Sequence, residues 1–259
     1  MKIQYASDLH LELSENSRWI GMNPLDVAGD ILVLAGDILY LGQEAHIKHP
    51  FWDWCSDNFR MTFVVPGNHE FYGGFDVLQC NDGFVLDVRN NVRYINNQVV
   101  TIDGIDFAFS TLWANIRIEN AFETEQCISD FRRIVCGGER LTVPMFNSLH
   151  EHSVEYLKKS VRESQASRKV VVSHHLPSNL LVAARFRGSR LNGAFVSEQS
   201  AWIADSGIDY WIYGNSHSNI DDNIGPTLCL TNQLGYIGQS CRPSSGFDRG
   251  KVITIPLSK

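Results

Sequence analysis

Residues 31–37, Ile-Leu-Val-Leu-Ala-Gly-Asp, form the stretch of sequence that decides the fold. Five consecutive apolar residues bounded by polar ones predict a β-strand that is covered on both faces, as in the sheets of α/β proteins. The predicted strand ends at Gly36 and is followed at once by the carboxylate of Asp37. An apolar strand with a short polar motif at its end recurs four more times along the chain.

The four other motifs also consist mainly of Asp, Asn and His residues. They follow predicted strands and are Asp8-Leu9-His10, Gly67-Asn68-His69-Glu70, His174-His175 and Gly214-Asn215-Ser216-His217. A rigid sheet can aim the side chains at its strand ends toward one point. Because carboxylate, amide and imidazole groups bind divalent metals, the five motifs together predict a metal site at the strand ends.

Each motif alone also fits an ordinary structural role. Asp8 and His10 lie two apart on a backbone expected to be extended, so both side chains point to one side and can chelate one metal. A turn-capping aspartate beside a surface histidine has the same pattern. Asp37 can bridge two cations, but it equally fits an Asx-turn at a strand end. Asn215 and His217 lie two apart on a turn, where Asn215 alone is an ordinary residue.

The motif at residues 67–70 is more specific. Gly67 allows a sharp turn, and Asn68 offers an amide oxygen to a hard cation. His69 is a candidate to protonate a leaving group. His174 and His175 alternate in direction along an extended chain, so only one of them is expected to face the site.

The conjunction of the motifs carries the metal prediction, because five of them follow five apolar strands. Oxygen and nitrogen ligands without a thiolate suit Mn²⁺, Fe, Zn²⁺, Co²⁺ or Ni²⁺, and Mn²⁺ is the ion expected in vitro. Two such ions about 3.5–4 Å apart would clamp a phosphoryl group and generate a hydroxide at neutral pH. The sequence therefore predicts two divalent metal ions as cofactors.

The rest of the chain is predicted to mix strands and helices without repeats or linkers. Helical spacing is found at residues 42–60, 147–160 and 197–205. Hairpin-linked strands are predicted at residues 92–95, 98–102 and 105–110, with a turn at Asp103-Gly104. Cap or loop segments over the site are expected at residues 113–145 and 179–196. This order predicts an α/β protein with mixed sheets and a single domain over residues 1–259.

The composition is that of a soluble globular protein. The 259 residues are 44% hydrophobic and carry a net charge of −7, which disfavours a dedicated nucleic-acid binder but not a phosphate substrate. No apolar run approaches a membrane span and no signal-peptide core precedes the first strand, so a cytoplasmic protein without a membrane partner is expected. The six scattered cysteines are expected to be reduced and mostly buried.

The five motifs resemble the signature of the calcineurin-like metallophosphoesterases, and the resemblance extends over nearly the whole chain. Further stretches are similar to a small bacterial branch of that family, at residues 130–134, 171–178, 195–197 and 211–214. The resemblance implies a four-layer α-β-β-α sandwich with two mixed sheets and a metal site at the strand ends.

The resemblance also implies a role for each motif residue. A first metal would be held by Asp8, His10, Asp37 and His217. Asp37 would bridge to a second metal, held in addition by Asn68 and His174. A metal-bridging hydroxide would attack phosphorus in line, with Asp37 and His69 as the catalytic residues and His69 assisting the leaving oxygen.

One position departs from the family pattern. The usual Gly-His-x-His motif is here Gly-Asn-Ser-His, so Asn215 takes the place of the fourth ligand of the second metal. An amide is a weaker donor than an imidazole for most transition metals, so the second site is expected to be weakened. Asn215 is either natural in a tuned or impaired site, or a change introduced to trap substrate or product. The undisturbed sequence around it favours the second explanation.

Candidate substrate contacts lie both inside and outside the motifs. Arg185, Arg187 and Arg190, in a glycine-containing loop, are placed to contact a second phosphate or polar group, although a solvated basic loop has the same pattern. Tyr72, close after Asn68, is a candidate neighbour of the leaving group, with core packing as its alternative. Asn68 is a candidate for both metal and substrate.

Four further positions have open interpretations. Asp130, Arg132 and Arg133 either line the pocket or belong to an internal ion pair. His150 falls on a helical stretch and is expected at the surface.

The predicted function is metal-dependent hydrolysis of a phosphomonoester or phosphodiester, with activity reduced by Asn215. The alternative of a different class is a phosphate-binding or scaffolding module that keeps the fold without turnover. A third interpretation is a nuclease, which the acidic composition disfavours. A phosphorylated small molecule or a phosphodiester is the expected partner, and the sequence leaves the substrate, the native metal and the oligomeric state open.

Overall fold

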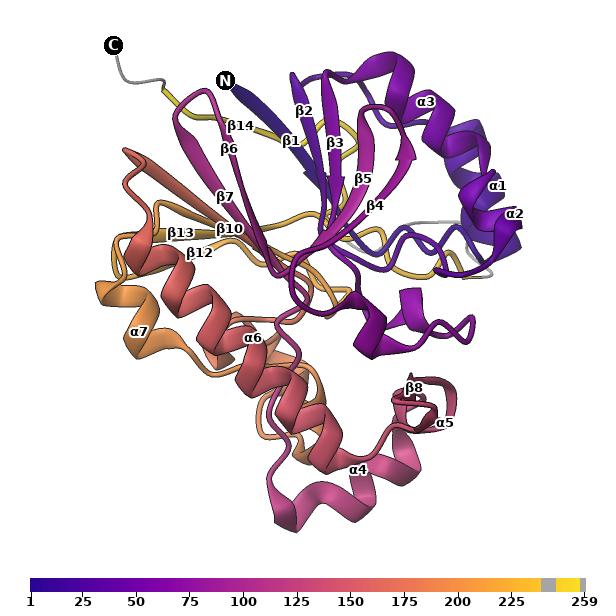
Figure 1. The fold of residues 1–259 in the computed structure, drawn as a ribbon, viewed down its shortest axis with the longest axis vertical. Helices are drawn as coiled ribbons and strands as arrows, with labels where there is room; N and C mark the ends of the chain where they lie inside the picture. Colours follow the sequence, from indigo (N-terminus) through magenta and orange to yellow (C-terminus); the bar gives the residue numbers. More distant parts are fainter. Residues whose placement is uncertain (239–245, 257–259) are drawn as a thin grey trace.

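Two six-stranded β-sheets face each other at the centre of the molecule, and helices cover their outer faces (Figure 1). The structure is a computed structural model that describes residues 1–238 and 246–256. The predicted α-β-β-α sandwich with two mixed sheets is confirmed.

The first sheet has four parallel strands with an antiparallel strand at each edge. Its spatial order is β14 (Val252–Thr254), β1 (Lys2–Ala6), β2 (Ile31–Leu34), β3 (Met61–Val64), β5 (Val92–Asn96) and β4 (Phe84–Arg89). Strand β2 lies between two parallel neighbours and is completely buried, as its uninterrupted apolar sequence predicts.

The second sheet repeats this design. Its spatial order is β12 (Asp222–Ile224), β13 (Thr227–Thr231), β11 (Tyr210–Tyr213), β10 (Arg168–Ser173), β7 (Ile105–Ser110) and β6 (Gln98–Ile102). In both sheets the edge strands are antiparallel and the central four are parallel. The parallel centres bring the carboxyl ends of neighbouring strands to one edge, where ligands bind in α/β proteins.

The chain passes from the first sheet to the second at Asn97, between β5 and β6. The prediction of a hairpin between residues 92–95 and 98–102 is wrong, because these strands belong to different sheets. The next hairpin is confirmed: β6 and β7 pair antiparallel around Asp103 and Gly104. These two residues have φ of 50° and 78°, as a tight type I′ turn requires.

Three hydrophobic clusters hold the layers together. The central cluster fills the space between the sheets and includes Val33, Phe63 and Phe109. A second cluster packs the first sheet against its helices, and a third packs the second sheet against helices on its other face. Each sheet therefore buries both faces, which explains why the central strands lack alternating polar residues.

The helices divide between the two outer faces (Figure 1). Beside the first sheet lie α1 (Ser14–Met22), α2 (Glu44–Ile47) and α3 (Pro50–Asn58). Beside the second sheet lie α6 (Val143–Glu163) and α7 (Ser200–Asp205). Helix α6 is longer than the predicted 147–160 because Pro144, which lacks an N–H, is well tolerated in its first turn.

The expectation that His150 is a surface residue is wrong. This α6 residue is buried, and its Nδ1 lies 3.2 Å from the carbonyl oxygen of Leu112. Burial lowers the pKa of His150, so its imidazole is neutral at neutral pH. Helical spacing alone did not reveal which side of α6 faces the protein.

The segment at residues 113–145 has its own short elements and projects from one end of the molecule (Figure 1). They are α4 (Ala121–Cys127), α5 (Asp130–Arg133), β8 (Val135–Cys136) and β9 (Glu139–Arg140). The segment at 179–196 forms three 3₁₀ turns, at Asn179–Leu181, Ala184–Phe186 and Arg190–Ala194. An ion pair of 3.5 Å between Arg190 and Glu123 joins the two segments.

The cysteine prediction holds for four of the five described thiols. Cys55, Cys80, Cys136 and Cys229 are buried and free, Cys127 is exposed and free, and Cys241 lies outside the described residues. Among the described residues, no helix is long and apolar enough to cross a lipid bilayer.

The central cluster should dominate the free energy of unfolding. Phe109 is fully buried and its ring lies 5.4 Å from that of Phe63, so we expect Phe109→Ala to destabilise the protein by about 3–5 kcal/mol. Phe122→Ala is the matched control, because Phe122 is 79% exposed. Urea unfolding followed by circular dichroism measures both, and equal effects of the two variants would contradict this assignment of the core.

Candidate metal centre and active site

The five polar motifs meet at the carboxyl ends of five strands. Motif loops after β1 and β2 are tied by hydrogen bonds of 2.9 Å from Asp8 N to Gly36 O and from His10 N to Asp37 O. In the second sheet, Gly214 N donates to His174 O at 3.0 Å. The two sheets thus present their motif loops at one end of the sandwich.

The ligand candidates have an unusual backbone conformation. Asp8, His10, Asp37, Asn215 and His217 have positive φ, between 47° and 76°. The expectation that Asp8 and His10 are co-directed by an extended backbone is therefore wrong, although both do face the site. Asp, Asn and His tolerate this left-handed conformation better than most residues, and such conformations cluster at functional sites.

Two glycines allow the motif loops to approach each other closely. A Cβ on Gly36 would lie 2.4 Å from His174 Nδ1, and a Cβ on Gly67 would lie 2.2 Å from Asp37 Oδ1. Any larger residue would push a candidate ligand out of place. Glycine at these positions is therefore required by packing around the site.

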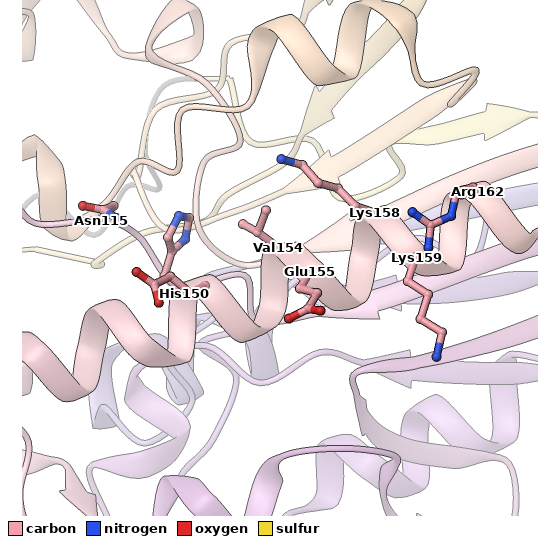
Figure 2. A pocket seen from close by; sticks show the side chains of 8 residues that line it. Asn115, His150, Val154, Glu155, Lys158, Lys159 and Arg162 are labelled. Carbon is pink, nitrogen blue, oxygen red and sulfur yellow. The ribbon is translucent and has the colours of Figure 1, made fainter.

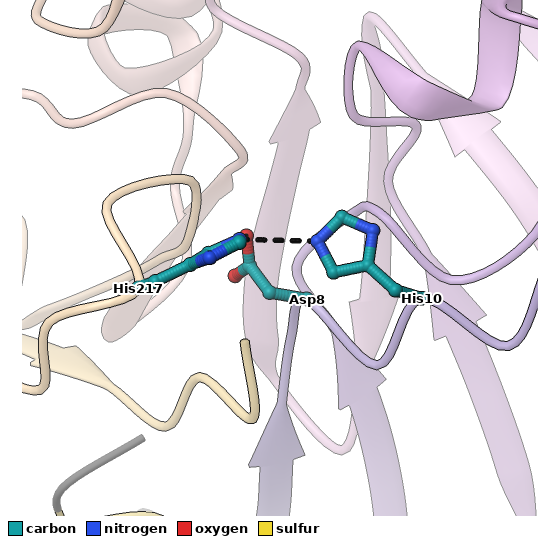
Figure 3. A group of neighbouring side chains, drawn as sticks. All are labelled: Asp8, His10 and His217. Atoms are coloured by element: carbon teal, nitrogen blue, oxygen red, sulfur yellow. Dashed lines mark hydrogen bonds and ion pairs between the residues drawn. The ribbon is translucent and has the colours of Figure 1, made fainter. Parts of the chain in front are cut away.

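A first group of ligand candidates consists of Asp8, His10 and His217 (Figure 3). The two imidazoles face each other with 3.0 Å between their Nε2 atoms, and His217 Nε2 lies 3.3 Å from Asp8 Oδ1. Asp8 and His10 come from the first sheet and His217 from the second. This group brings together three of the predicted ligands.

Asp37 joins this group to a second one. Its Oδ2 lies 3.7 Å from His10 Nε2, and its Oδ1 lies 3.4 Å from His174 Nε2. Ligand atoms within 4.8 Å of one another also define the groups Asp8–Asp37–His174 and His10–Asp37–His69. One carboxylate therefore faces two neighbouring positions, as the expected bridging role requires.

Two histidines have their second ring nitrogen committed to a hydrogen bond. His174 Nδ1 lies 2.8 Å from the carbonyl oxygen of Ala35, and His10 Nδ1 lies 3.0 Å from Glu12 Oε1. A neutral ring in each case carries its proton on Nδ1 and leaves Nε2 as a lone pair. Both lone pairs point into the site.

With the rings neutral, as a metal requires, these lone pairs would face other acceptors. His174 Nε2 lies 3.0 Å from Asn68 Oδ1, whose amide nitrogen is already hydrogen-bonded elsewhere, and carboxylate oxygens lie nearby. The neighbouring carboxylates raise the pKa of His174, so without a metal this ring holds a proton, and a divalent cation would supply the positive charge in its place. The donor set thus fits the two metal ions that the motifs predict.

Asn215 is fixed through its backbone rather than through its side chain. Its N–H lies 3.0 and 3.1 Å from the two carboxylate oxygens of Asp8. Its side-chain Nδ2 is buried and has no hydrogen-bond partner among the described residues. A buried amide group without a partner is costly, so this side chain is the least satisfied member of the candidate ligand set.

Glu70 shapes the site, and sequence reasoning assigned it no role. This fully buried carboxylate accepts hydrogen bonds from the N–H groups of Asp37, Ile38 and Gly67, at 2.9, 2.7 and 2.7 Å. Burial and the charge of Asp37 raise the pKa of Glu70 to about 7. Glu70 thereby holds two motif loops together from behind.

Glu12 is the second residue that sequence reasoning missed. Its Oε1 lies 3.0 Å from His10 Nδ1 and 2.9 Å from His69 Nδ1, and its side chain is 1% exposed. Burial opposes ionisation, but these two histidines hold the pKa of Glu12 below its usual range. The spacing Asp8–His10–Glu12, every second residue, is the signal that could have revealed it.

The carboxylates make the site attractive to positive charge. Although burial favours neutral rings, Asp37 and the other carboxylates raise the pKa of His69 to about 9 and that of His174 to about 10. His175 behaves oppositely: it faces away from the site toward Thr111 O, and burial holds its pKa well below the usual range. As expected, only one residue of this pair faces the site.

The α5 helix reaches the site through Asp130. Its buried Oδ1 accepts hydrogen bonds from Asn68 Nδ2 at 2.9 Å and from the hydroxyl of Tyr72. Tyr72 also accepts a bond of 3.2 Å from Asn68 Nδ2. Because the amide nitrogen is held by these two oxygens, Asn68 Oδ1 is turned toward His174. Asp130 forms no ion pair, so the internal-pair interpretation is wrong for the described residues.

A cavity of about 920 Å³ opens over the candidate ligands. It is lined by Asp37, Asn68, His69, Asn215 and His217, and by both segments that were expected to form a cap. Tyr72, Arg133 and Arg185 also line it, whereas Arg187 and Arg190 are not among its lining residues. The cavity therefore contains two of the four predicted substrate contacts outside the metal-ligand set.

A second pocket, on α6, is a weaker candidate for a functional site (Figure 2). It is lined by Asn115, His150, Glu151, Val154, Glu155, Lys158, Lys159 and Arg162. Figure 2 shows the amino groups of Lys158 and Lys159 extending in opposite directions. Its cations therefore do not converge on one ligand, and its histidine is the buried His150.

Comparison with known proteins agrees with this geometry. The family profile described as calcineurin-like phosphoesterase matches residues 1–219. The chain belongs to the calcineurin-like phosphoesterase family. Hydrolysis of phosphoesters is the general activity of this family, whose members generally use two divalent metals, and the structure supplies ligand groups for them.

Similar proteins span the same length. Uncharacterized protein L509 of Acanthamoeba polyphaga mimivirus is 27% identical in an alignment 258 residues long that covers 90% of this chain and 91% of that protein. The phosphopantetheinyl hydrolase PptH of Mycobacterium tuberculosis has a TM-score of 0.63 at 16% identity, covering 91% of this phosphoesterase and 89% of PptH. TT1561 of Thermus thermophilus has a TM-score of 0.53 at 11% identity, covering 90% of this phosphoesterase and 88% of TT1561. These two likenesses show the fold.

Glu12 should support the candidate metal ligand His10. We expect Glu12→Gln, which keeps the size but removes the charge, to weaken Mn²⁺ binding about tenfold or more, because a carboxylate partner makes a ligating imidazole more basic. Calorimetric titration of the metal-free protein measures the effect. Glu15→Ala is the control, since Glu15 is exposed, and unchanged Mn²⁺ affinity in Glu12→Gln would refute this role.

Asp130 should fix the orientation of the Asn68 amide. Asp130→Ala removes the acceptor of Asn68 Nδ2, so we expect the affinity for the more weakly bound of two Mn²⁺ ions to fall about tenfold or more. Tyr72→Phe, which leaves the Asp130–Asn68 bond in place, should have a smaller effect. A folded Asp130→Ala protein that binds both ions as tightly as the unmodified chain would show that Asn68 is oriented by other means.

Proposed function

We propose that this phosphoesterase hydrolyses phosphomonoesters or phosphodiesters with two divalent metal ions. The observation that carries the proposal is the convergence of acceptor atoms around Asp37, whose two oxygens face His10 Nε2 and His174 Nε2. A bridging carboxylate between two imidazole sites suits a pair of metals. Mn²⁺ is the ion we propose for assays in vitro.

The ligands divide into two sets that share Asp37. The proposed first set is Asp8, His10, Asp37 and His217, and the proposed second set is Asp37, Asn68 and His174, with Asn215 at the fourth position. When bound, the two metals supply charge to the phosphoryl oxygens and make a water molecule acidic enough to react at neutral pH. Asn68 and Asn215 are both amides and so weak donors for a transition metal, and Asn215 is the one that stands where the family pattern has an imidazole.

The protein itself provides orientation and a proton. Glu12 holds His69 Nδ1, and Tyr236 lies with its hydroxyl 3.3 Å from His69 Nε2, on the cavity side. We assign His69 as the group that donates a proton to the leaving oxygen. Asn68, Tyr72 and Arg185 are proposed as substrate contacts, together with Arg187, which does not line the cavity.

A phosphate-binding module without turnover is the second candidate function. The buried, unpartnered Nδ2 of Asn215 favours it, because an incomplete second site would hold a phosphate without activating a nucleophile. The close grouping of Asp8, His10, Asp37, His174 and His217, with His69 on the cavity wall, supports the enzyme.

Replacement of Asn215 separates the two functions. We expect Asn215→His to raise the rate of hydrolysis of 4-nitrophenyl phosphate or bis(4-nitrophenyl) phosphate with Mn²⁺ by about 10–100-fold and to strengthen binding of a second Mn²⁺. Absorbance of nitrophenolate and calorimetry provide the two readouts. Asp37→Asn, which removes the shared charge, is the inactive control.

The opposite outcome has a clear meaning. If the chain and Asn215→His both bind two Mn²⁺ ions and neither hydrolyses either ester, the phosphate-binding module is the better description. If both hydrolyse the esters at the same rate, Asn215 does not limit the site.

A further inference from the structure

Two arginines line the active-site cavity without a carboxylate partner. Arg133 comes from α5 and Arg185 from the turn at Ala184–Phe186, so each of the two covering segments supplies one. Among the described residues, neither forms an ion pair, whereas Arg190 in the same region pairs with Glu123. The acidic residues that line the cavity, Asp37 and Asp130, are buried. These two arginines are therefore positive charges on the cavity wall that no described carboxylate pairs with.

Arg133 is held in place by neutral groups only. Its guanidinium carbon lies 4.4 Å from the ring centre of Tyr72 and 5.5 Å from that of Tyr40, and its Nη2 donates to the Tyr40 hydroxyl at 3.3 Å. A guanidinium has five N–H donors, and one of them is used here. Cation–π contacts and one hydrogen bond thus orient the group and leave most of its donors for a ligand.

Arg133 lies on the same side of the cavity as His69, because both contact Tyr72. The Tyr72 ring lies between them, with its centre 4.3 Å from that of His69. His69 is the residue proposed to protonate the leaving oxygen, so Arg133 lies where the leaving group of a substrate would extend. The cavity wall also has apolar residues, among them Ile128 on the covering segment that carries Arg133.

We propose that Arg133 binds a second anionic group on the leaving group of the substrate. The substrate class is then a phosphoester whose leaving group combines an apolar part with a carboxylate or a further phosphate. This inference rests on the proposed hydrolytic function and adds the identity of the leaving group to it. A planar guanidinium with free N–H donors recognises both kinds of anion through paired hydrogen bonds.

Matched substrates test the charge of the leaving group. Phenyl phosphates with a carboxylate at the meta or para position are compared with those that carry a neutral hydroxymethyl group at the same position. With Mn²⁺ bound, we expect kcat/KM to favour at least one carboxylate over its neutral partner, and Arg133→Gln to reduce this preference about tenfold. Arg133→Lys, which keeps the charge but loses the planar fork, should retain part of it.

Arg132→Gln is the matched control. Arg132 is the neighbouring residue of α5, but it bonds to Gln126 O at 2.6 Å and does not line the cavity. The ratio of kcat/KM for a carboxylate substrate to kcat/KM for its neutral partner should be the same in Arg132→Gln as in the unmodified chain. If the ratio is near one in the unmodified chain, or is unchanged in Arg133→Gln, the proposal for Arg133 is overturned while hydrolysis stands.

Failure of the proposed hydrolytic function gives a different result. In that case neither the four phosphates nor bis(4-nitrophenyl) phosphate is hydrolysed, either by the Mn²⁺-loaded chain or by Asn215→His, and the leaving-group assignment falls with it. If turnover is too slow to measure but present, binding of the same four phosphates by calorimetry provides the ratio. The proposal is supported if the unmodified chain binds a carboxylate-bearing phosphate more tightly than its neutral partner and Arg133→Gln does not. Equal affinities of the unmodified chain for the two phosphates overturn it.

Discussion

Buried negative charge is the constraint on which the structure of the site depends. Asp8, Asp37, Glu70 and Asp130 are fully or almost fully buried, and the Glu12 side chain is buried beside them. Like charges repel strongly where water is excluded, so each carboxylate needs a compensating partner. Histidines compensate the negative charges of Asp37 and Asp8, and backbone N–H groups compensate that of Glu70. The motif loops take their shape from this compensation.

The same constraint explains the strained backbone. Carboxylate and imidazole groups can converge only if the chain turns sharply just after each strand, and positive φ at Asp8, His10 and Asp37 provides these turns. Residues in such conformations persist when the surroundings hold them in place. Here the hydrogen bonds between the loops after β1 and β2, and the Glu70 bonds behind them, do so.

The apolar strands and the polar motifs at their ends predicted most of the fold, because a buried strand of four or five apolar residues has few alternatives. The sequence could not reveal that residues 92–96 and 98–102 belong to different sheets, since adjacent strands usually pair. It also could not reveal Glu70 as part of the site, because a carboxylate that binds backbone N–H groups has no spacing rule, and for Asp130 it left pocket lining and an internal ion pair open. The buried face of His150 was missed because α6 has histidines and polar residues on several sides. The individual ligand assignments stay predictions.

The crossing of the chain at Asn97 divides the site between two halves of the sandwich. Asp8, His10, Asp37 and Asn68 belong to the half built before this residue, while His174 and His217 belong to the half built after it. A cation shared by both halves binds only when they are docked against each other, so its binding free energy is added to the stability of the folded state. The metal would then hold the two sheets together, and the free energy of unfolding would rise with the concentration of free metal.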